Sequence, residues 1–196
     1  MDEDKAFEAG WEYRVVHKAY EAMLNTDLAL KQIIQLFDSD GDGLVSPQEF
    51  KQAMQVWRTA LGEEHPHYAT SLGSLALLYN VMGSYEQALP LFQQAMEIRR
   101  TALGEDHPDY ATSLNNLAIL YQSMGSYEQA LPLYQQAIEI QRTALGEDHP
   151  SYATSLNNFA DLYQSMGSYE QALPLYLQAL EIERTALGED HPSYAT

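Results

Sequence analysis

A set of regularly spaced oxygen-bearing residues is the most chemically distinctive feature of this 196-residue sequence. Residues 38–49 are DSDGDGLVSPQE, which fits the calcium-loop pattern D-x-[DN]-x-[DN]-G-x5-E at every fixed position. In that pattern Gly43 makes a sharp turn, and the ligands are Asp38, Asp40, Asp42, the carbonyl group of Leu44, Ser46 directly or through water, and Glu49. A shell of about seven oxygens, with Glu49 bidentate, suits Ca2+ and fits the smaller Mg2+ poorly. The sequence therefore predicts a calcium site.

Apolar side chains at helical spacing flank this loop on both sides. Leu30, Ile33, Ile34 and Phe37 precede it, and Phe50, Ala53, Met54 and Trp57 follow it. The loop with its flanks, residues 27–58, resembles an EF-hand, which implies a helix-loop-helix that binds Ca2+. The alternative is an Asp- and Gly-rich turn that binds no ion. EF-hands usually occur in pairs, so this single loop would pair with the N-terminal segment or a second chain, or face solvent.

A 42-residue period organises the rest of the chain. Residues 101–142 return as residues 143–184 with six changes, a looser copy spans 59–100, and a further copy begins at 185 and stops at 196. Repeats of this length are typical of solenoids, in which each unit needs its neighbours to cover its apolar face. We therefore expect three stacked repeats and the start of a truncated fourth.

Each repeat has the signals of two helices. Pro108 suits the first turn of the first helix, with Asp106 or His107 as its cap, and Gly125 ends that helix in a left-handed conformation. In the second helix, Ser126 and Gln129 fit a capping box, Gly104 closes the equivalent helix of the preceding repeat, and Pro132 predicts a mild kink.

The apolar positions of the repeat resemble those of the tetratricopeptide repeat (TPR). The residues that carry the likeness are Leu117, Ala118, Tyr121, Gly125, Tyr127, Ala130, Tyr134 and Ala137. The 42-residue length and the GEDHP segment are similar to the kinesin-light-chain type. This resemblance covers residues 59–196, and it implies an all-α fold: a right-handed superhelix whose first helices line a concave peptide-binding groove.

Position by position, the resemblance also implies which side chains face that groove. They include Thr112, Asn115, Asn116, Ile119 and Gln122 in one repeat, and Asn157, Asn158, Asp161 and Gln164 in the next, with Ser123 and Ser165 beside them. Asparagine amides both donate and accept hydrogen bonds, which suits an extended peptide backbone. No Lys or Arg occupies these positions, so we expect a neutral, apolar or basic partner rather than an acidic one. The change from Ile119 to Asp161 marks either selectivity for a ligand or sequence drift on a tolerant surface.

The two modules join without a linker. Residues 49–66 align without a gap with residues 133–150, so the helix that leaves the calcium loop is also in register as the second helix of a repeat. Calcium would then either rotate the entering helix against the solenoid or act as a rigid structural ion. Residues 1–26 predict a further helix, which would cap the first repeat or lie in the groove as an autoinhibitory segment.

Composition narrows the classes of function. The sequence has 28 Asp and Glu residues against 10 Lys and Arg, a formal charge of −18, and no cysteine. Such charge disfavours nucleic acid and anionic membrane surfaces, and the absence of cysteine excludes disulfides and thiolate catalysis. No membrane-length apolar run or targeting segment is visible, so we expect an intracellular protein of the cytoplasm or an organelle lumen.

The leading interpretation is a non-enzymatic, calcium-responsive adaptor, because no nucleophile, phosphate-binding or zinc-protease motif is present. The alternatives are a structural calcium site or buffer without switching, and a regulatory fragment of a larger enzyme. One histidine per repeat predicts turn and cap roles, since the copies lie too far apart to share an ion. The truncated end should expose an apolar flank around Leu175, Ala179 and Leu180, and together with the unpaired loop this flank would favour a homodimer.

Overall fold

The computed structural model describes residue 58 and residues 62–187, and these form an all-α structure, as expected. Six helices are present in these ranges: α4 (Pro66–Val81), α5 (Tyr85–Leu103), α6 (Pro108–Ser123), α7 (Tyr127–Leu145), α8 (Pro150–Ser165) and α9 (Tyr169–Leu187). The predicted N-terminal helix, the calcium loop and the last nine residues lie outside the described residues. None of the six helices is long and apolar enough to cross a bilayer.

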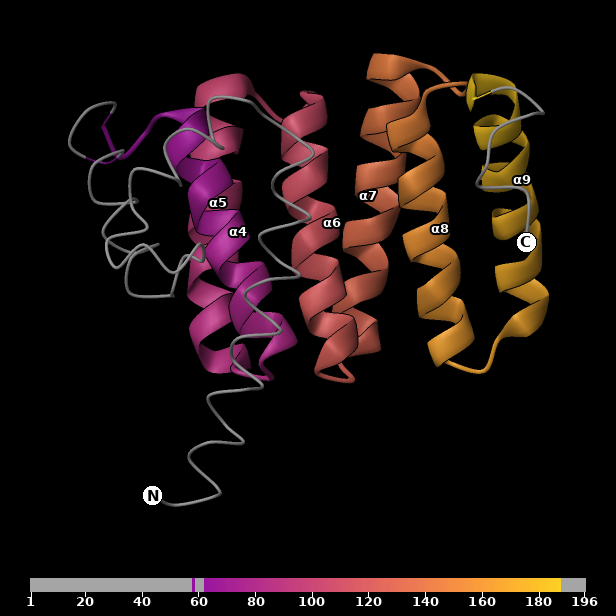
Figure 1. Ribbon diagram of the computed structural model, residues 1–196, viewed down its shortest axis with the longest axis horizontal. Coiled ribbons are helices and arrows are strands. Elements are labelled where there is room, and N and C mark those ends of the chain that lie inside the picture. Colours follow the sequence, from indigo (N-terminus) through magenta and orange to yellow (C-terminus); the bar gives the residue numbers. More distant parts are fainter. Residues whose placement is uncertain (1–57, 59–61, 188–196) are drawn as a thin grey trace, which may run out of the picture. The chain divides into compact units, whose positions relative to one another are not determined.

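The chain divides into two compact units, Met1–Ile98 and Arg99–Thr196, with the boundary inside α5. In the second unit, α6 packs on α7 and α8 packs on α9, which gives two helical hairpins. Helix α8 also packs on α7 and touches α6, so the two hairpins are stacked in sequence order (Figure 1). This stacking places the first helices of consecutive repeats, α6 and α8, next to each other.

Histidine side chains cap the first helices. The Nδ1 atom of His107 accepts a hydrogen bond from the backbone N–H of Asp109 at 3.1 Å, and Nδ1 of His149 accepts one from Ser151 at 3.1 Å. His65 makes the equivalent bond in the first repeat. The proline that follows each histidine has no N–H to satisfy, so it fits the first turn. Of the two caps that the sequence allowed, Asp106 and His107, the structure has His107.

A glycine ends each first helix. Gly125 has φ +74°, its N–H donates to Gln122, and the N–H of Ser126 reaches back to the carbonyl of Tyr121 at 2.8 Å. This pair of bonds is a Schellman motif, which satisfies carbonyl groups at the helix end. The predicted left-handed Gly125 is therefore confirmed, and Gly104 likewise follows the last residue of α5 with φ +94°.

The predicted capping box at Ser126 and Gln129 is wrong. Ser126 is the N-cap of α7, but its side chain makes no capping hydrogen bond, and its ψ of 61° is not extended. In a capping box the Gln129 side chain would accept the N–H of the cap residue. That N–H is already used in the Schellman motif of α6, because the turn between the helices is so short. Pro132, at which the sequence predicts a mild kink, lies within α7, and the helix continues past it to Leu145.

Small and large apolar side chains together form the core between the stacked hairpins. The buried cluster consists of Ala118, Ala130, Tyr134, Phe159 and Leu162, which come from all three of α6, α7 and α8. Tyr134 and Ala130 have no exposed surface, and the ring centroids of Tyr134 and Phe159 are 6.0 Å apart. Small residues let the helices approach closely, so the larger rings can fill the space between them.

Helix α9 leaves an apolar face uncovered by the described residues. Its exposed side chains include Tyr169, Leu173, Leu177 and Leu180. The expectation from the sequence was right for Leu180 but wrong for Ala179, which is fully buried in a cluster with Tyr152 of α8. Leu175 also packs against that cluster. The exposed face is therefore turned away from α8.

The histidine caps make a prediction about stability. Replacing His149 with Ala removes the acceptor for the Ser151 N–H and should cost about 1 kcal/mol, seen as a lower midpoint in urea unfolding. Replacing His149 with Asn keeps a strong cap acceptor and should leave the midpoint close to that of the wild type. Equal midpoints for the two variants would show that the cap bond contributes nothing.

Candidate functional site

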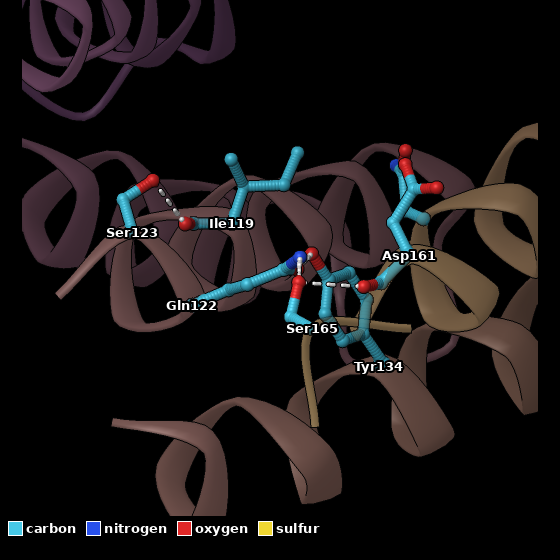
Figure 2. Close-up of a pocket in the computed structure, with 7 residues that line it drawn as sticks. Ile119, Gln122, Ser123, Tyr134, Asp161 and Ser165 are labelled. Carbon is cyan, nitrogen blue, oxygen red and sulfur yellow. Dashed lines mark hydrogen bonds between the residues drawn. The ribbon is translucent and has the colours of Figure 1, made fainter. Parts of the chain in front are cut away.

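A cavity of about 350 Å3 lies between the first helices of two consecutive repeats (Figure 2). It is lined by Ile119, Gln122 and Ser123 of α6, Asn158, Asp161 and Ser165 of α8, and Tyr134 of α7. Two lining positions of α6, those of Ile119 and Ser123, line the cavity again on α8 one 42-residue period later as Asp161 and Ser165. The cavity therefore depends on the packing of α8 against α6 and α7. It combines apolar surface with amide, hydroxyl and carboxylate groups that could bind a polar chain.

Hydrogen bonds fix the side chains on one wall of the cavity. The hydroxyl group of Tyr134 donates to Oε1 of Gln122 at 2.9 Å, and Nε2 of Gln122 donates to Oγ of Ser165 at 3.0 Å. Ser165 in turn donates to the carbonyl group of Asp161 at 2.8 Å. Both ends of the Gln122 amide are therefore used. This wall is held in place before any ligand arrives, which lowers the entropic cost of binding.

The carboxylate of Asp161 accepts a hydrogen bond from the hydroxyl group of Tyr176 on α9. Burial raises the pKa of Tyr176 to about 12, with a further contribution from its hydrogen bond to Asp161 and from that negative charge. Burial also raises the pKa of Tyr134 well above its usual value, and the charge of Asp161 adds to the effect. These shifts show that the Asp161 charge acts on both rings.

Six of the predicted groove residues meet at the cavity: Ile119, Gln122, Ser123, Asn158, Asp161 and Ser165. Thr112 and Asn116 do not line it. Thr112 is exposed, and its hydroxyl group donates to the carbonyl of Pro108 at 3.1 Å.

Three other predicted residues are engaged elsewhere. Asn115 is buried, and its amide donates to the hydroxyl group of Ser155 in the seam between α6 and α8. Asn157 donates to Glu183 at 3.0 Å, and Gln164 accepts from Tyr176 at 2.8 Å. The adjacent residues Asn115 and Asn116 differ because consecutive positions on a helix point about 100° apart. We therefore assign Asn115 to packing between repeats.

Tyr134 is one of the apolar positions that carry the resemblance to the tetratricopeptide repeat, and its contact with the cavity was not predicted. A signal for that contact is present within the repeats. Tyr134 and Tyr176 occur together with Gln122 and Gln164, whereas the first repeat has Phe92 with an asparagine in place of the glutamine. The phenolic hydroxyl and the longer amide thus change together, as expected of hydrogen-bond partners.

No described arginine lines the cavity. The arginines in the described ranges lie on second helices or next to their ends: Arg58, Arg99, Arg100, Arg142 and Arg184. Arg142 and Arg184 each pair with a glutamate of their own helix at 2.7 Å. Arg99 is buried, and it donates to Ser113 at 3.0 Å and to the carbonyl group of Asp109. The cavity thus carries the Asp161 charge without a basic residue beside it.

The described residues were also compared with the predicted metal ligands. Within residue 58 and residues 62–187, no three His, Cys, Asp or Glu side chains are grouped closely enough to hold an ion. The histidines at the repeat turns serve as helix caps instead, as expected. All six predicted calcium ligands, Asp38 to Glu49, lie outside the described residues.

Arg58 and Gly62 are described residues that lie where the predicted calcium module joins the first repeat. The N–H of Gly62, which has φ +90°, donates to the carbonyl group of Arg58 at 3.1 Å. The same bond closes α5, from Gly104 to Arg100 at 3.0 Å, and α7, from Gly146 to Arg142 at 3.1 Å. Arg58 also pairs with Glu63, as Arg100 pairs with Glu105. The hydrogen bond and the ion pair of Arg58 therefore match those at the ends of second helices of the repeats.

Comparison with known families gives a match over most of the chain. The family model described as "Tetratricopeptide repeat" matches residues 41–100, 72–143, 114–185 and 151–196. The first match begins inside the predicted calcium loop, so it includes the segment in which a helix is predicted to follow that loop. No curated protein matches the chain.

Solved structures give the same fold. Repeats of a candidate kinesin light chain from Podosopora anserina, described as nearly identical and TPR-like, are 29% identical to this chain, with a TM-score of 0.57. The match covers 71% of this chain and 66% of that one. BtubC (BKLC) from P. vanneervenii is 24% identical, with a TM-score of 0.65 over 92% of this chain and 74% of that one. At that identity, the second likeness concerns the fold alone.

The tyrosines beside Asp161 predict a loss of stability in alkali. Their pKa values are raised on folding, so near pH 10 and above the folded state holds protons that the unfolded state releases. The stabilisation is complete below about pH 10 and should be lost as the pH rises towards 12. Urea unfolding at a series of pH values should show a shallower loss for Tyr176→Phe. An unchanged slope would contradict the assignment.

Proposed function

We propose that this chain, which belongs to the tetratricopeptide repeat family, is a non-enzymatic adaptor that binds a protein or peptide segment along α6 and α8. The observation that carries the proposal is the cavity between these helices, which is lined by side chains of α6, α7 and α8. Ligand sites tend to be preformed concavities with a few well-placed polar groups. Gln122 and Tyr134 hold one wall of this cavity in that way.

The chemistry of the cavity favours an extended segment that is neutral, apolar or basic. The half-buried Asn158 has an amide that both donates and accepts, which suits a peptide backbone, and Ile119 offers apolar surface. An acidic partner would meet the carboxylate of Asp161 with no arginine at the cavity to offset it. Like charges at an interface cost free energy and so exclude such partners.

The groove proposal predicts the effect of a blocking substitution. Peptides of twelve residues, selected from a phage-displayed library on the full chain, are measured against variants by fluorescence anisotropy. Ser123 is exposed at the cavity, so Ser123→Trp should weaken binding by about tenfold or more. Gln135, exposed on α7 and not among the lining residues, provides the matched control Gln135→Trp, which should leave the affinity unchanged. Equal affinity for both variants, or no selected peptide, overturns the proposal.

We further propose that residues 38–49 bind Ca2+, with Asp38, Asp40, Asp42, Leu44, Ser46 and Glu49 as ligands. The support is the sequence of the loop, whose donor set consists of oxygens only. Carboxylate, carbonyl and hydroxyl oxygens suit a hard cation of the size of Ca2+. The ion would draw together four carboxylates that otherwise repel each other.

Calcium responsiveness would depend on the helix that follows the loop. The hydrogen bond from Gly62 to Arg58 is the one that also closes α5 and α7, which supports the register predicted for that helix. A change of angle at the loop would then move the entering helix relative to the repeats. An EF-hand that barely opens would leave the same ion in a structural or buffering role. Small-angle scattering with calcium and with chelator separates the two roles.

Calorimetric titration of the full chain with CaCl2 tests the calcium site itself. Wild type should bind one ion in the loop, and Glu49→Gln should weaken that binding by about tenfold or more, because the bidentate ligand loses its charge. Asp148→Asn makes the same change of charge in a repeat turn and should leave the affinity as it is. If Glu49→Gln does not alter the heat of binding, the ion binds elsewhere and residues 38–49 are not the calcium site.

A further inference from the structure

We propose that Asp161 makes the cavity between α6 and α8 a recognition site for a basic side chain of the bound segment, arginine in particular. The inference rests on the proposed function, since it names the chemistry that the same groove selects. It is supported by the unbalanced charge of Asp161, the apolar neighbour across the cavity and the difference between repeats.

The charge of Asp161 has no cationic partner among the described residues. Within the second unit, Arg100 pairs with Glu105, and the guanidinium groups of Arg142 and Arg184 pair with glutamates on their own second helices. Arg99 bonds to Ser113 of α6. The hydrogen bond that Asp161 accepts from Tyr176 is made by one oxygen, Oδ1. A carboxylate has lone pairs on both oxygens, so Oδ2 remains an acceptor for an incoming donor.

The position of Ile119 favours a side chain with an apolar stem and a cationic head. Figure 2 shows the Ile119 side chain and the Asp161 carboxylate projecting in the same direction, away from the ring of Tyr134. The methylene groups of an arginine could pack on Ile119 while its guanidinium group reaches Asp161. Arginine fits better than lysine because its planar fork of N–H groups matches carboxylate geometry.

Comparison of the repeats localises this preference to one cavity. The position of Asp161 is Leu77 in the first repeat and Ile119 in the second, so the carboxylate occurs once in the three full repeats. Residues 143–184 carry six acidic residues and one arginine, a net charge of −5, which adds a field that attracts cations. The segment should therefore place its basic residue at the cavity between the second and third repeats.

Titration of the full 15N-labelled chain with small probes tests this directly by NMR. The probes are N-acetyl-arginine methylamide and N-acetyl-citrulline methylamide, which have nearly the same shape but differ in charge. We expect the arginine probe to shift the amide signals of Ile119, Gln122 and Ser165, with an affinity at least about fivefold above that of citrulline. In Asp161→Asn the two probes should bind alike, whereas Asp148→Asn should keep the difference.

Two outcomes overturn the inference. One is equal affinity of the two probes for wild type, and the other is a preference for arginine that persists in Asp161→Asn. If Asp161→Asn is too unstable to assign, Asp161→Ile, which introduces the residue of the preceding repeat, provides the same comparison. Library peptides that Ser123→Trp blocks but that bind wild type and Asp161→Asn equally would leave the groove proposal intact and refute the role of Asp161.

Discussion

The constraint on which the described structure depends is that a repeat cannot bury its own second helix. In α7 the side chains of Tyr127, Leu131 and Ile138 pack against a cluster that includes Phe159 and Leu162 of the next hairpin. In α9 the residues at the positions of Tyr127 and Leu131, Tyr169 and Leu173, are exposed among the described residues. Apolar burial of this kind is the main favourable term in folding, so stacking stabilises each repeat and also sets the spacing of α6 and α8.

The seam and the cavity are two sides of that same contact. On the buried side, Asn115 donates to Ser155, and Ser155 donates to Gln141, so polar side chains pair where α6, α7 and α8 meet. On the open side, Ile119 and Asp161 occupy equivalent positions of α6 and α8 and face a space that no described side chain fills. The seam fixes the register, and the register brings the groove residues together.

Local signals in the sequence were enough to predict the helices and their glycine ends, because helical spacing and left-handed glycines act over short distances. Six of the cavity residues were predicted from the resemblance to the tetratricopeptide repeat. The capping box at Ser126 failed because its N–H is taken by the preceding helix at Tyr121, which local sequence spacing does not show. Asn115 and Asn158 belong to the same repeated Asn-Asn pair, and only the packing of α8 on α6 decides which face is buried. The contact of Tyr134 with the cavity was not predicted because its ring belongs to the buried core, whereas its hydroxyl group donates a hydrogen bond to Gln122 at the cavity wall.

In the proposed function, the partner segment binds to the first helices of the repeats rather than to the outer faces of the second helices. Amide hydrogen exchange of the full chain, with and without a library-selected peptide, measures this most directly, because a bound segment slows exchange in the elements it covers. We expect the peptide to slow amide exchange in residues 116–123 and 158–165, and we do not expect protection that is limited to α9. Protection restricted to the exposed face of α9, with α6 and α8 unchanged, would contradict the proposed function.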